Sequence, residues 1–367
     1  MHINSTHVKN IRNVEDCSLA FSPLVNFLVG PNGAGKTALI EAFYVMSRGR
    51  GFRGRSTDAL INNESDFLSI DIKVEAEGGL TRDVGGRKKR AGKLEYSLDG
   101  LVLKSFEEVG RQLPTQLILP NESELVYLGP EVRRAYLDWG LFHVEQSYLG
   151  LARAYRRALK QRNEWLKNRT GKADPWLEGL AELGVKINAF RQIYVDGVGR
   201  LFNRLVSTFF DLGPVSLKYD GGGYAEDLSG AVSAMYDSAS RDARARTTNL
   251  GPHRADMIIL VTELPARSYC SRGQAKLISL CLALSQALYL KDKKGVASIL
   301  LIDDIVAELD HNNLIQSLEL IKSMGMQTFI TASDSAFSEK VGGLFGEQIV
   351  FHVEQGNFIK ENDYGVR

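Results

Sequence analysis

The feature that most constrains this chain is a glycine loop at residues 30–37, which matches the pattern G-x-x-x-x-G-K-[ST] in full. Glycines in such a loop let backbone N–H groups turn toward the β- and γ-phosphates of a nucleotide, and the helix that follows adds its positive end. Asn26–Val29 before the loop has the pattern of a buried strand, and residues 37–46 have that of a helix. The order strand, loop, helix favours a phosphate site over a structural glycine turn. The sequence therefore predicts an ATP site made by Gly30, Pro31, Asn32, Gly33, Ala34, Gly35, Lys36 and Thr37.

Within this loop, two side chains carry chemistry. Lys36 would place a point charge on the phosphates and take part in catalysis, and the Thr37 hydroxyl would ligate Mg²⁺. A second acidic element follows the apolar segment 299–302, which has the character of a buried parallel strand and ends in Asp303 and Asp304. We expect Asp303 to hold Mg²⁺ directly or through water, and Asp304 to be the general base that orients the attacking water. The alternative is an ordinary Asp-Asp turn after a strand.

Turnover should be slow, because Asp304 is one methylene shorter than the Glu that many ATP-binding cassettes use as base.

Far downstream, the string Ser271, Arg272, Gly273, Gln274 precedes a strong helical segment at 275–290. A Ser hydroxyl and a Gly backbone at a helix N-terminus form an anion site, and in a cassette this site meets the γ-phosphate held by a second copy. The alternative is a simple helix cap, since Ser is a favoured capping residue.

The string 307–310, with Glu308 and Asp310, would line the same interface between two copies, although it also suits a plain helix start. Together these strings predict an ATP-dependent homodimer. Thr331 closes a strand where many cassettes have a histidine, so sensing of the γ-phosphate would rest on a hydroxyl. Arg12 and Asn13 lie on the first strand near the glycine loop and would reach the base or a phosphate of the nucleotide, with a surface strand pair as an equal alternative.

The residue that links the two lobes to Mg²⁺ is less defined. Gln116, beside the apolar segment 117–119, is the candidate, and Asn121 and Glu122 compete with it. Five motifs follow one another along the chain, at 30–37, 271–274, 299–304, 307–310 and 331–333. Their order predicts an α/β fold of the ABC-type ATPase head, with a mixed sheet built from both chain ends and an inserted, mainly helical second lobe. We expect an ATP-binding lobe at 1–112 and 294–367, and a lobe at 113–293 that carries the Ser-Arg-Gly-Gln motif. The insert lacks sustained heptads and contains Pro175 and Pro214, which excludes a long coiled coil.

The composition limits the class of protein and its place in the cell. The 367 residues are 44% hydrophobic and 24% charged, which is ordinary for a soluble globular protein. No apolar run approaches the roughly 20 residues of a membrane helix, and the N-terminus lacks a signal-peptide pattern, so we expect a cytoplasmic protein with no membrane partner. Net charge is only +1, but basic residues cluster locally. The candidates for DNA contact, each with a solvated surface as its alternative, are Arg50, Arg53, Arg133, Arg134, Arg156 and Arg162.

Further strings give a specific resemblance. The chain resembles the RecF family of bacterial DNA-repair ATPases nearly end to end, including the Arg in Ser-Arg-Gly-Gln where transporters prefer Gly. The other strings that carry the resemblance are 9–13 (KNIRN), 48–53 (RGRGFR), 133–138 (RRAYLD), 159–163 (LKQRN) and 251–256 (GPHRAD). The resemblance implies a weak, DNA-stimulated ATPase that binds double-stranded DNA or the junctions of single-stranded gaps. It also implies that ATP drives head-to-head dimerisation, that slow hydrolysis reopens the dimer, and that RecR and RecO are partners in loading RecA.

Two positions depart from this pattern or lack a role. The family often has Pro-Glu where this chain has Pro120 and Asn121, which leaves the lobe-linking residue open. His253 and Arg254 of the 251–256 string would either touch phosphate or stabilise the lobe.

Two other function classes compete with a DNA clamp. A transporter ATPase subunit predicts a short insert and a switch histidine, which the chain lacks, and a non-catalytic ATP-binding module conflicts with the Asp303–Asp304 pair.

Overall fold

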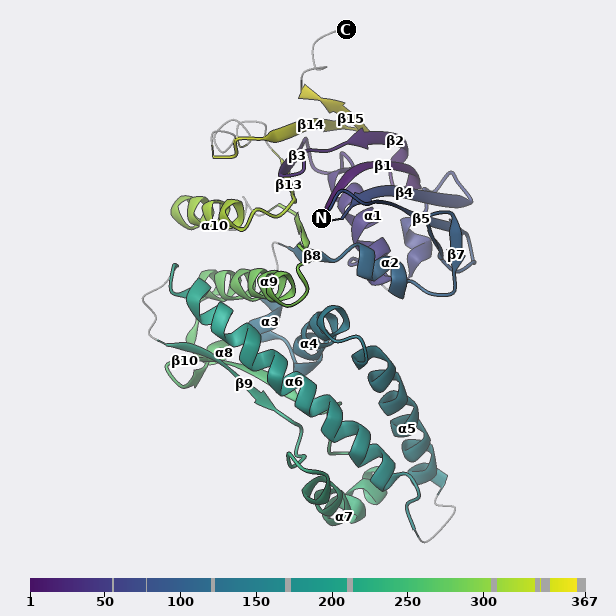
Figure 1. The fold of residues 1–367 in the computed structure, drawn as a ribbon, viewed down its shortest axis with the longest axis vertical. Helices are drawn as coiled ribbons and strands as arrows, with labels where there is room; N and C mark the ends of the chain where they lie inside the picture. Colours follow the sequence, from purple (N-terminus) through teal and green to yellow (C-terminus); the bar gives the residue numbers. More distant parts are fainter. Residues whose placement is uncertain are drawn as a thin grey trace. The chain divides into compact units, whose positions relative to one another are not determined.

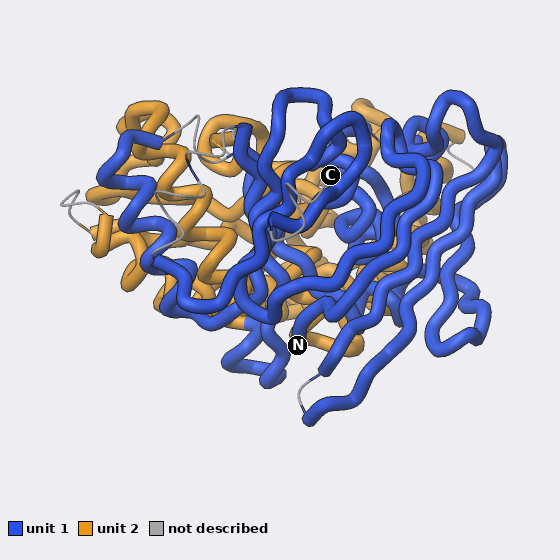
Figure 2. Tube along the Cα trace, turned by 90° about the horizontal axis from the view of Figure 1, so that it is seen from above, with its two compact units in different colours: residues 1–122, 290–367 blue, residues 123–289 orange. Residues whose placement is uncertain are grey.

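The computed structural model describes residues 1–54, 56–76, 78–119, 123–168, 173–209, 214–304, 309–333, 337 and 344–361. The chain divides into two compact units. Unit 1 comprises Met1–Glu122 and Leu290–Arg367, and unit 2 comprises Ser123–Tyr289. Both chain ends therefore belong to unit 1 (Figures 1 and 2).

Unit 1 contains an antiparallel sheet formed almost entirely by the first hundred residues. Its strand order is β2-β1-β4-β5-β6-β7. The tight link between β6 and β7 is Asp99–Gly100, with φ of 50° and 81°, and positive φ at both positions matches the right-handed twist of a hairpin. The strands are β1 (His2–Ile11), β2 (Val14–Ala20), β4 (Phe67–Glu75), β5 (Thr81–Lys89), β6 (Glu95–Leu98) and β7 (Leu101–Leu103).

A second, mixed sheet of unit 1 joins segments from both ends of the chain. Its order is β15-β14-β3-β13-β12-β8, and every pair is parallel except β14 with β15. Fully buried strands such as β12, Ile-Leu-Leu-Ile, suit the middle of a parallel sheet. The strands are β3 (Val25–Val29), β8 (Thr115–Ile118), β12 (Ile299–Ile302), β13 (Thr328–Ala332), β14 (Gln348–Glu354) and β15 (Asn357–Lys360).

Helix α1 (Lys36–Arg48) lies at the centre of the core of unit 1. One hydrophobic cluster contains Phe43 of α1, Ile70 of β4 and Phe329 of β13, so residues of both sheets pack with this helix. The rings of Phe43 and Phe329 have centroids 5.1 Å apart. This packing fixes the N-terminus of α1, which starts at the glycine loop. The other helices of this unit are η1 (Thr57–Leu60), α2 (Glu107–Gln112) and α10 (His311–Met324).

Unit 2 is mainly helical but also holds a small antiparallel sheet, β11-β10-β9. The sequence patterns did not predict β9 or β10. The elements of the unit are α3 (Glu124–Tyr127), α4 (Pro130–Val144), α5 (Tyr148–Asn168), α6 (Leu177–Val206), β9 (Val215–Asp220), α7 (Leu228–Ala245), β10 (Asp256–Val261), β11 (Leu264–Pro265), α8 (Ala266–Tyr269) and most of α9 (Arg272–Lys294).

The ABC-head fold class predicted from the sequence is confirmed by this mixed sheet and its helices. The expected lobe boundaries fell at 112/113 and 293/294, whereas the compact units meet at 122/123 and 289/290. The first difference has a structural reason, because β8 pairs in parallel with β12 and so belongs to the sheet of unit 1.

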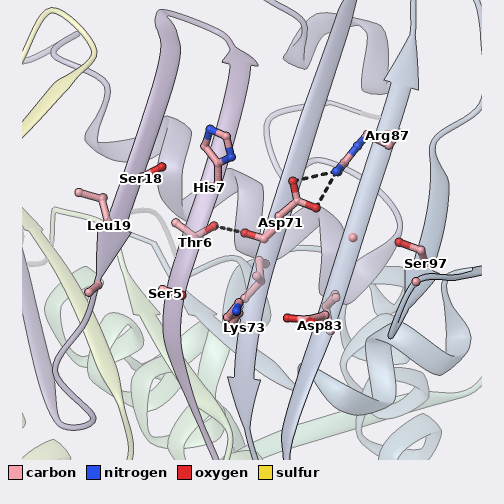
Figure 3. Close-up of a pocket in the computed structure, with 15 residues that line it drawn as sticks. Ser5, Thr6, His7, Ser18, Leu19, Asp71, Lys73, Asp83, Arg87 and Ser97 are labelled. Carbon is pink, nitrogen blue, oxygen red and sulfur yellow. Dashed lines mark hydrogen bonds and ion pairs between the residues drawn. The ribbon is translucent and has the colours of Figure 1, made fainter.

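The solvent face of the antiparallel sheet carries a shallow polar hollow of about 700 Å³ (Figure 3). Two of its charged side chains are paired, since Arg87 on β5 bonds both carboxylate oxygens of Asp71 on β4 at 2.7 and 2.8 Å. Thr6 on β1 donates to the Asp71 backbone carbonyl at 2.8 Å. The Arg87–Asp71 pair therefore leaves no net charge from these two side chains in the hollow.

Candidate functional site

The glycine loop connects β3 to α1 with the backbone geometry that its sequence predicts. Gly33 and Gly35 have φ of 80° and 119°, in the region that favours glycine. Gly30 is required for a different reason: a Cβ there would lie 2.1 Å from the carbonyl oxygen of Val353 on β14. Gly35 caps α1 without a side chain, so the first backbone N–H groups of the helix stay available to a phosphate.

Lys36 lies at the start of α1 and is folded back over the loop. Its Nζ donates to the carbonyl oxygens of Gly30 and Pro31, at 2.5 and 3.0 Å. Burial lowers the pKa of Lys36, and the nearby carboxylates of Asp304 and Asp303 oppose that shift. Among the described residues, no carboxylate lies within ion-pair distance of its ammonium. The Lys36 ammonium is therefore bonded only to neutral backbone oxygens, and an anionic ligand can replace these as its partner.

The two aspartates after β12 are held by hydroxyls of neighbouring strands and of α1. Thr37 Oγ1 donates toward both carboxylate oxygens of Asp303 at 3.2 Å, and Thr331 Oγ1 donates to Asp303 Oδ1 at 2.7 Å. The backbone N–H of Asp304 donates to the same Thr331 oxygen at 2.8 Å. Asp304 has φ of 50°, an uncommon conformation for a non-glycine residue.

Thr331 was expected to sense the γ-phosphate. Its side chain is fully buried, and its hydroxyl is committed to Asp303 and Asp304, so here it positions the two aspartates. Ser333, two residues after Thr331, is exposed. The link between Thr331 and the aspartates could not be read from the sequence, because it joins residues 27 and 28 positions apart through adjacent parallel strands.

These groups suit Mg²⁺, a hard cation that prefers oxygen ligands and usually keeps waters and substrate phosphate oxygens in its shell. Thr37 and Asp303 bring oxygens together at one point of the sheet edge. Within the described ranges no cluster of three or more His, Cys, Asp or Glu side chains could enclose a metal ion. The donor set therefore fits an ion that is completed by a nucleotide.

The two residues after β1 reach this edge in different ways. Asn13 Nδ2 donates to the Gly33 carbonyl of the loop at 2.8 Å. Arg12 forms an ion pair with Glu41, a side chain of α1 that is 1% exposed. Asn13 is thus in contact with the loop itself, whereas Arg12 is tied to the helix behind it.

Gln116 is not brought to this edge. It lies within β8 opposite Leu300, while Asp303 follows the end of β12 and donates its N–H to the Ile118 carbonyl at 3.0 Å. Three residues of strand, about 10 Å, separate Gln116 from Asp303 along the sheet. Its competitors Asn121 and Glu122, and Glu308 of the 307–310 string, lie outside the described residues.

Ser271 begins α9 in a reciprocal cap. The backbone N–H of Ser271 donates to Gln274 Oε1 at 2.9 Å, and the Gln274 N–H donates to Ser271 Oγ at 3.3 Å. Ser271, Arg272 and Gly273 are exposed, and a Cβ on Gly273 would meet nothing within 4 Å. Capping and anion binding are compatible here, because the turn is built by its own side chains and remains open to solvent. Asp310 likewise caps α10 by accepting from the Asn313 N–H at 3.0 Å.

The structure corrects two of the expected DNA contacts. Arg162 is fully buried, where it bonds Asp174 and Asp242 at 2.7 Å each. Arg133 is 5% exposed and holds both carboxylate oxygens of Asp256 at 2.7 and 2.8 Å. A buried guanidinium that is paired with carboxylates cannot also contact a nucleic acid without breaking the fold.

The other four candidates are differently placed. Arg50 and Arg53 are exposed on the segment after α1, and the Arg53 guanidinium lies 5.9 Å from the centre of the Phe52 ring. Arg134 is half-buried and Arg156 is exposed, both in unit 2. Arg50, Arg53 and Arg156 are exposed and Arg134 is partly exposed, so all four stay predictions of DNA contact.

Comparison with known proteins agrees with this geometry. The family model "RecF/RecN/SMC N terminal domain" matches residues 2–357. The chain is 35% identical to the "DNA replication and repair protein RecF" of Edwardsiella ictaluri, over 95% of this chain and 97% of that protein. The chain belongs to the RecF family. A second relative of the same name, from Azotobacter vinelandii, is 32% identical over 99% of this chain and 100% of its own.

Solved structures give the same assignment. The structure titled "recombination mediator protein RecF-ATPrS in RecFOR pathway" superposes with a TM-score of 0.87 at 26% identity and covers 98% of both chains. An SMC head bound to a winged-helix domain of ScpA reaches a TM-score of 0.58 at 14% identity over 98% of this chain and 97% of that chain, which supports the shared fold alone. The resemblance inferred from the sequence strings is thereby confirmed. No helix in the described parts of the chain is both long and apolar enough to cross a bilayer.

Proposed function

We propose that this RecF-family protein is an ATP-dependent DNA-binding protein of recombinational gap repair. Unit 1 is the ATP-binding lobe, and unit 2 carries the Ser-Arg-Gly-Gln motif. The observation that carries the proposal is the hydroxyl-held aspartate pair: Thr37 and Thr331 both donate to Asp303 beside the glycine loop. Relatives named as replication and repair proteins, and a neighbour titled as an ATP complex, support ATP as the ligand.

The proposed chemistry is slow ATP hydrolysis to ADP and phosphate. The loop N–H groups and Lys36 bind the phosphates, and Thr37 with Asp303 would hold Mg²⁺, which supplies charge neutralisation on the phosphate oxygens. Asp304 accepts a proton from the attacking water as its oxygen bonds the γ-phosphorus and the bond to the β-phosphate oxygen breaks. The Asp304 backbone is fixed by Thr331, which keeps this base at the end of β12.

We propose that ATP also joins two copies. The exposed turn at Ser271 is an open helix N-terminus, an arrangement that binds anions, and it would complete the ATP site of a second copy. Hydrolysis then reopens the dimer. Weak stimulation of the ATPase by DNA follows if DNA favours the closed pair.

The dimer would bind double-stranded DNA or the junction beside a single-stranded gap, mainly through phosphate contacts of exposed arginines such as Arg50 and Arg53. Such binding is strongly salt-dependent and carries little sequence preference. A structural neighbour is described as a protein of the RecFOR pathway, which supports RecO and RecR as partners here. We further propose RecA loading as the outcome and the cytoplasm as the location.

Light scattering with a non-hydrolysable ATP analogue tests the shared site. The variant Ser271→Arg should bind nucleotide as the wild type does but stay monomeric. Ser229→Arg is a matched control, because Ser229 is an exposed serine in the first turn of α7 in the same unit. A Ser271→Arg protein that still dimerises with ATP would remove the motif from the interface.

A second variant tests the base. Asp304→Asn should lower turnover about 10²–10⁴-fold, the usual worth of a general base, without loss of ATP binding. Unchanged turnover would mean that Asp304 is not the base.

A further inference from the structure

Three strings that the nucleotide edge does not use meet in unit 2. They are 133–138 on α4, 159–163 on α5 and 251–256 before and at the start of β10. The first and third are joined where Arg133 holds Asp256 and where Arg134 Nη1 donates to the Ala255 carbonyl at 2.8 Å. Residues far apart in sequence thus form one locality.

The histidine of the third string is locked in a single tautomer. Its Nε2 lies 3.0 Å from the Thr248 carbonyl oxygen, which can only accept, so Nε2 carries the hydrogen. Nδ1 must then accept from the Tyr155 hydroxyl at 2.8 Å. Burial lowers the pKa of His253, which agrees with this neutral form. His253 and Tyr155 therefore form a fixed, uncharged wall.

Beside that wall is a pocket of about 170 Å³, with room for several waters at about 30 Å³ each. Its polar lining includes Arg134, Asp138, Arg156 and Arg191. Each of the three side-chain nitrogens of Arg191 makes a hydrogen bond within the unit. They donate to the Tyr148 hydroxyl at 3.1 Å and to the Pro252 carbonyl and Asp138 Oδ1 at 2.7 Å each, so Arg191 has a structural role.

The pocket has an excess of positive charge. Its single carboxylate belongs to Asp138. Asp138 Oδ1 accepts a hydrogen bond from Arg191, and Oδ2 accepts only a long one, at 3.3 Å, from Arg156. Arg134 has one hydrogen bond, to a backbone carbonyl, and no carboxylate of the described residues lies within 4 Å of it. Three guanidinium groups thus share one acidic group.

The half-buried position makes Arg134 costly as it stands. Burial, followed by repulsion from Arg191, lowers the pKa of Arg134, and the carboxylates of Glu131, Asp256 and Asp138 oppose that shift. An arginine nevertheless remains a cation at any ordinary pH. A partly desolvated charge with no carboxylate of the described residues in direct contact is unfavourable, and an incoming anion would relieve that cost. The hollow on the sheet of unit 1 differs, because there Asp71 and Arg87 neutralise each other (Figure 3).

We propose that this pocket of unit 2 binds a phosphate group, with Arg134 and Arg156 donating to its oxygens. Guanidinium forks match the tetrahedral oxygens of phosphate, and an excess of two positive charges favours a dianion over a single carboxylate. The ligand is therefore free phosphate or the terminal phosphate of a nucleic acid strand. Only the second source rests on the proposed DNA binding, and ATP-dependent dimerisation is independent of both.

The first experiment titrates the full-length protein, saturated with a non-hydrolysable ATP analogue, with inorganic phosphate by calorimetry. The γ-phosphate of the analogue keeps inorganic phosphate away from the glycine loop. Arg156→Gln should weaken binding about tenfold, the worth of one charge-assisted hydrogen bond. Arg157→Gln is the matched control, because Arg157 is the next residue of α5, is also exposed, and is not among the residues that line the pocket. Equal binding by the two variants overturns the proposal.

The second experiment separates the sources by anisotropy of 3′-labelled single strands with a 5′-phosphate or a 5′-hydroxyl. A preference for the 5′-phosphate that Arg156→Gln abolishes and Arg157→Gln keeps identifies a strand end as ligand. No preference, together with Arg156-dependent binding of inorganic phosphate, identifies free phosphate. A glutamate-rich peptide that displaces phosphate as effectively as phosphate displaces itself would overturn the assignment in favour of an acidic protein. If Arg156→Gln loses DNA binding but still dimerises with ATP, the defect lies in this pocket and not in the ATP site.

Discussion

The nucleotide edge of unit 1 and the arginine network of unit 2 use the same kinds of charged side chain in opposite ways. At the edge, Lys36 and Asp303 are bonded to backbone oxygens and hydroxyls. In the network, Arg133 and Arg162 are bonded directly to carboxylates. A charge held by neutral groups remains available to a ligand, whereas a charge buried in an ion pair is part of the fold. Local sequence does not distinguish these two situations.

The strongest attempt to break this comparison is to remove the guanidinium of Arg162. Arg162→Met leaves Asp242, which is fully buried, without its ion-pair partner, and should destabilise the protein by about 3–5 kcal/mol in urea unfolding. Arg157→Met on the exposed side of the same helix should change stability by under about 0.5 kcal/mol. A stable Arg162→Met protein with weakened DNA binding would instead return Arg162 to the list of DNA contacts.

The complementary change at the edge is Lys36→Met. Because Lys36 contacts only carbonyl oxygens in the loop, the fold should survive while ATP affinity falls by about 1.5–3 kcal/mol, or roughly 10–150-fold. Equilibrium binding of a fluorescent ATP analogue, alongside a thermal unfolding curve, measures both. A variant that unfolds instead would place Lys36 with the structural charges.

Thr331 sharpens the comparison because its hydroxyl serves both position and stability. Thr331→Val removes the donor to Asp303 and the acceptor for the Asp304 N–H, so stability should fall by about 1–3 kcal/mol. Turnover should fall about 10–100-fold through misplacement of the aspartates. Thr331→Ser keeps the hydroxyl and should retain most activity. Equal turnover by the valine and serine variants would contradict the positioning role.

The smallest expected effect is the contribution of His253 to the loss of folding stability at acid pH. Its pKa is lower in the folded state than the ordinary 6.5, so below about pH 6.5 the unfolded chain binds more protons and stability falls as pH falls. The slope contributed by this one group is at most about 1.4 kcal/mol per pH unit. The stability advantage of wild type over His253→Gln should therefore shrink between pH 7.5 and 5.5. A difference that does not change with pH would mean that His253 is not buried in its neutral form.

Much of unit 1 follows from short-range pattern. The loop at 30–37, the helix after it and the buried strands 26–29 and 299–302 are each set by local residue types, and the structure has them as expected. The lobe-linking position did not follow, since Gln116 is fixed by the pairing of β8 with β12, a contact across more than 180 residues. The strands β9 and β10 of unit 2 were missed for a related reason, because each is short and forms only by pairing with another segment of the chain.

The sequence by itself determined that a phosphate loop is present, that two aspartates follow a buried strand, and that the chain is of the RecF kind, because these properties are written in contiguous residues. Only the tertiary structure decided which arginines are available. Arg156 and Arg162 stand six residues apart on one helix, yet the first is exposed and the second is sealed against Asp242 of α7. Burial and pairing are properties of the surroundings of a side chain, and these come from distant segments of the chain.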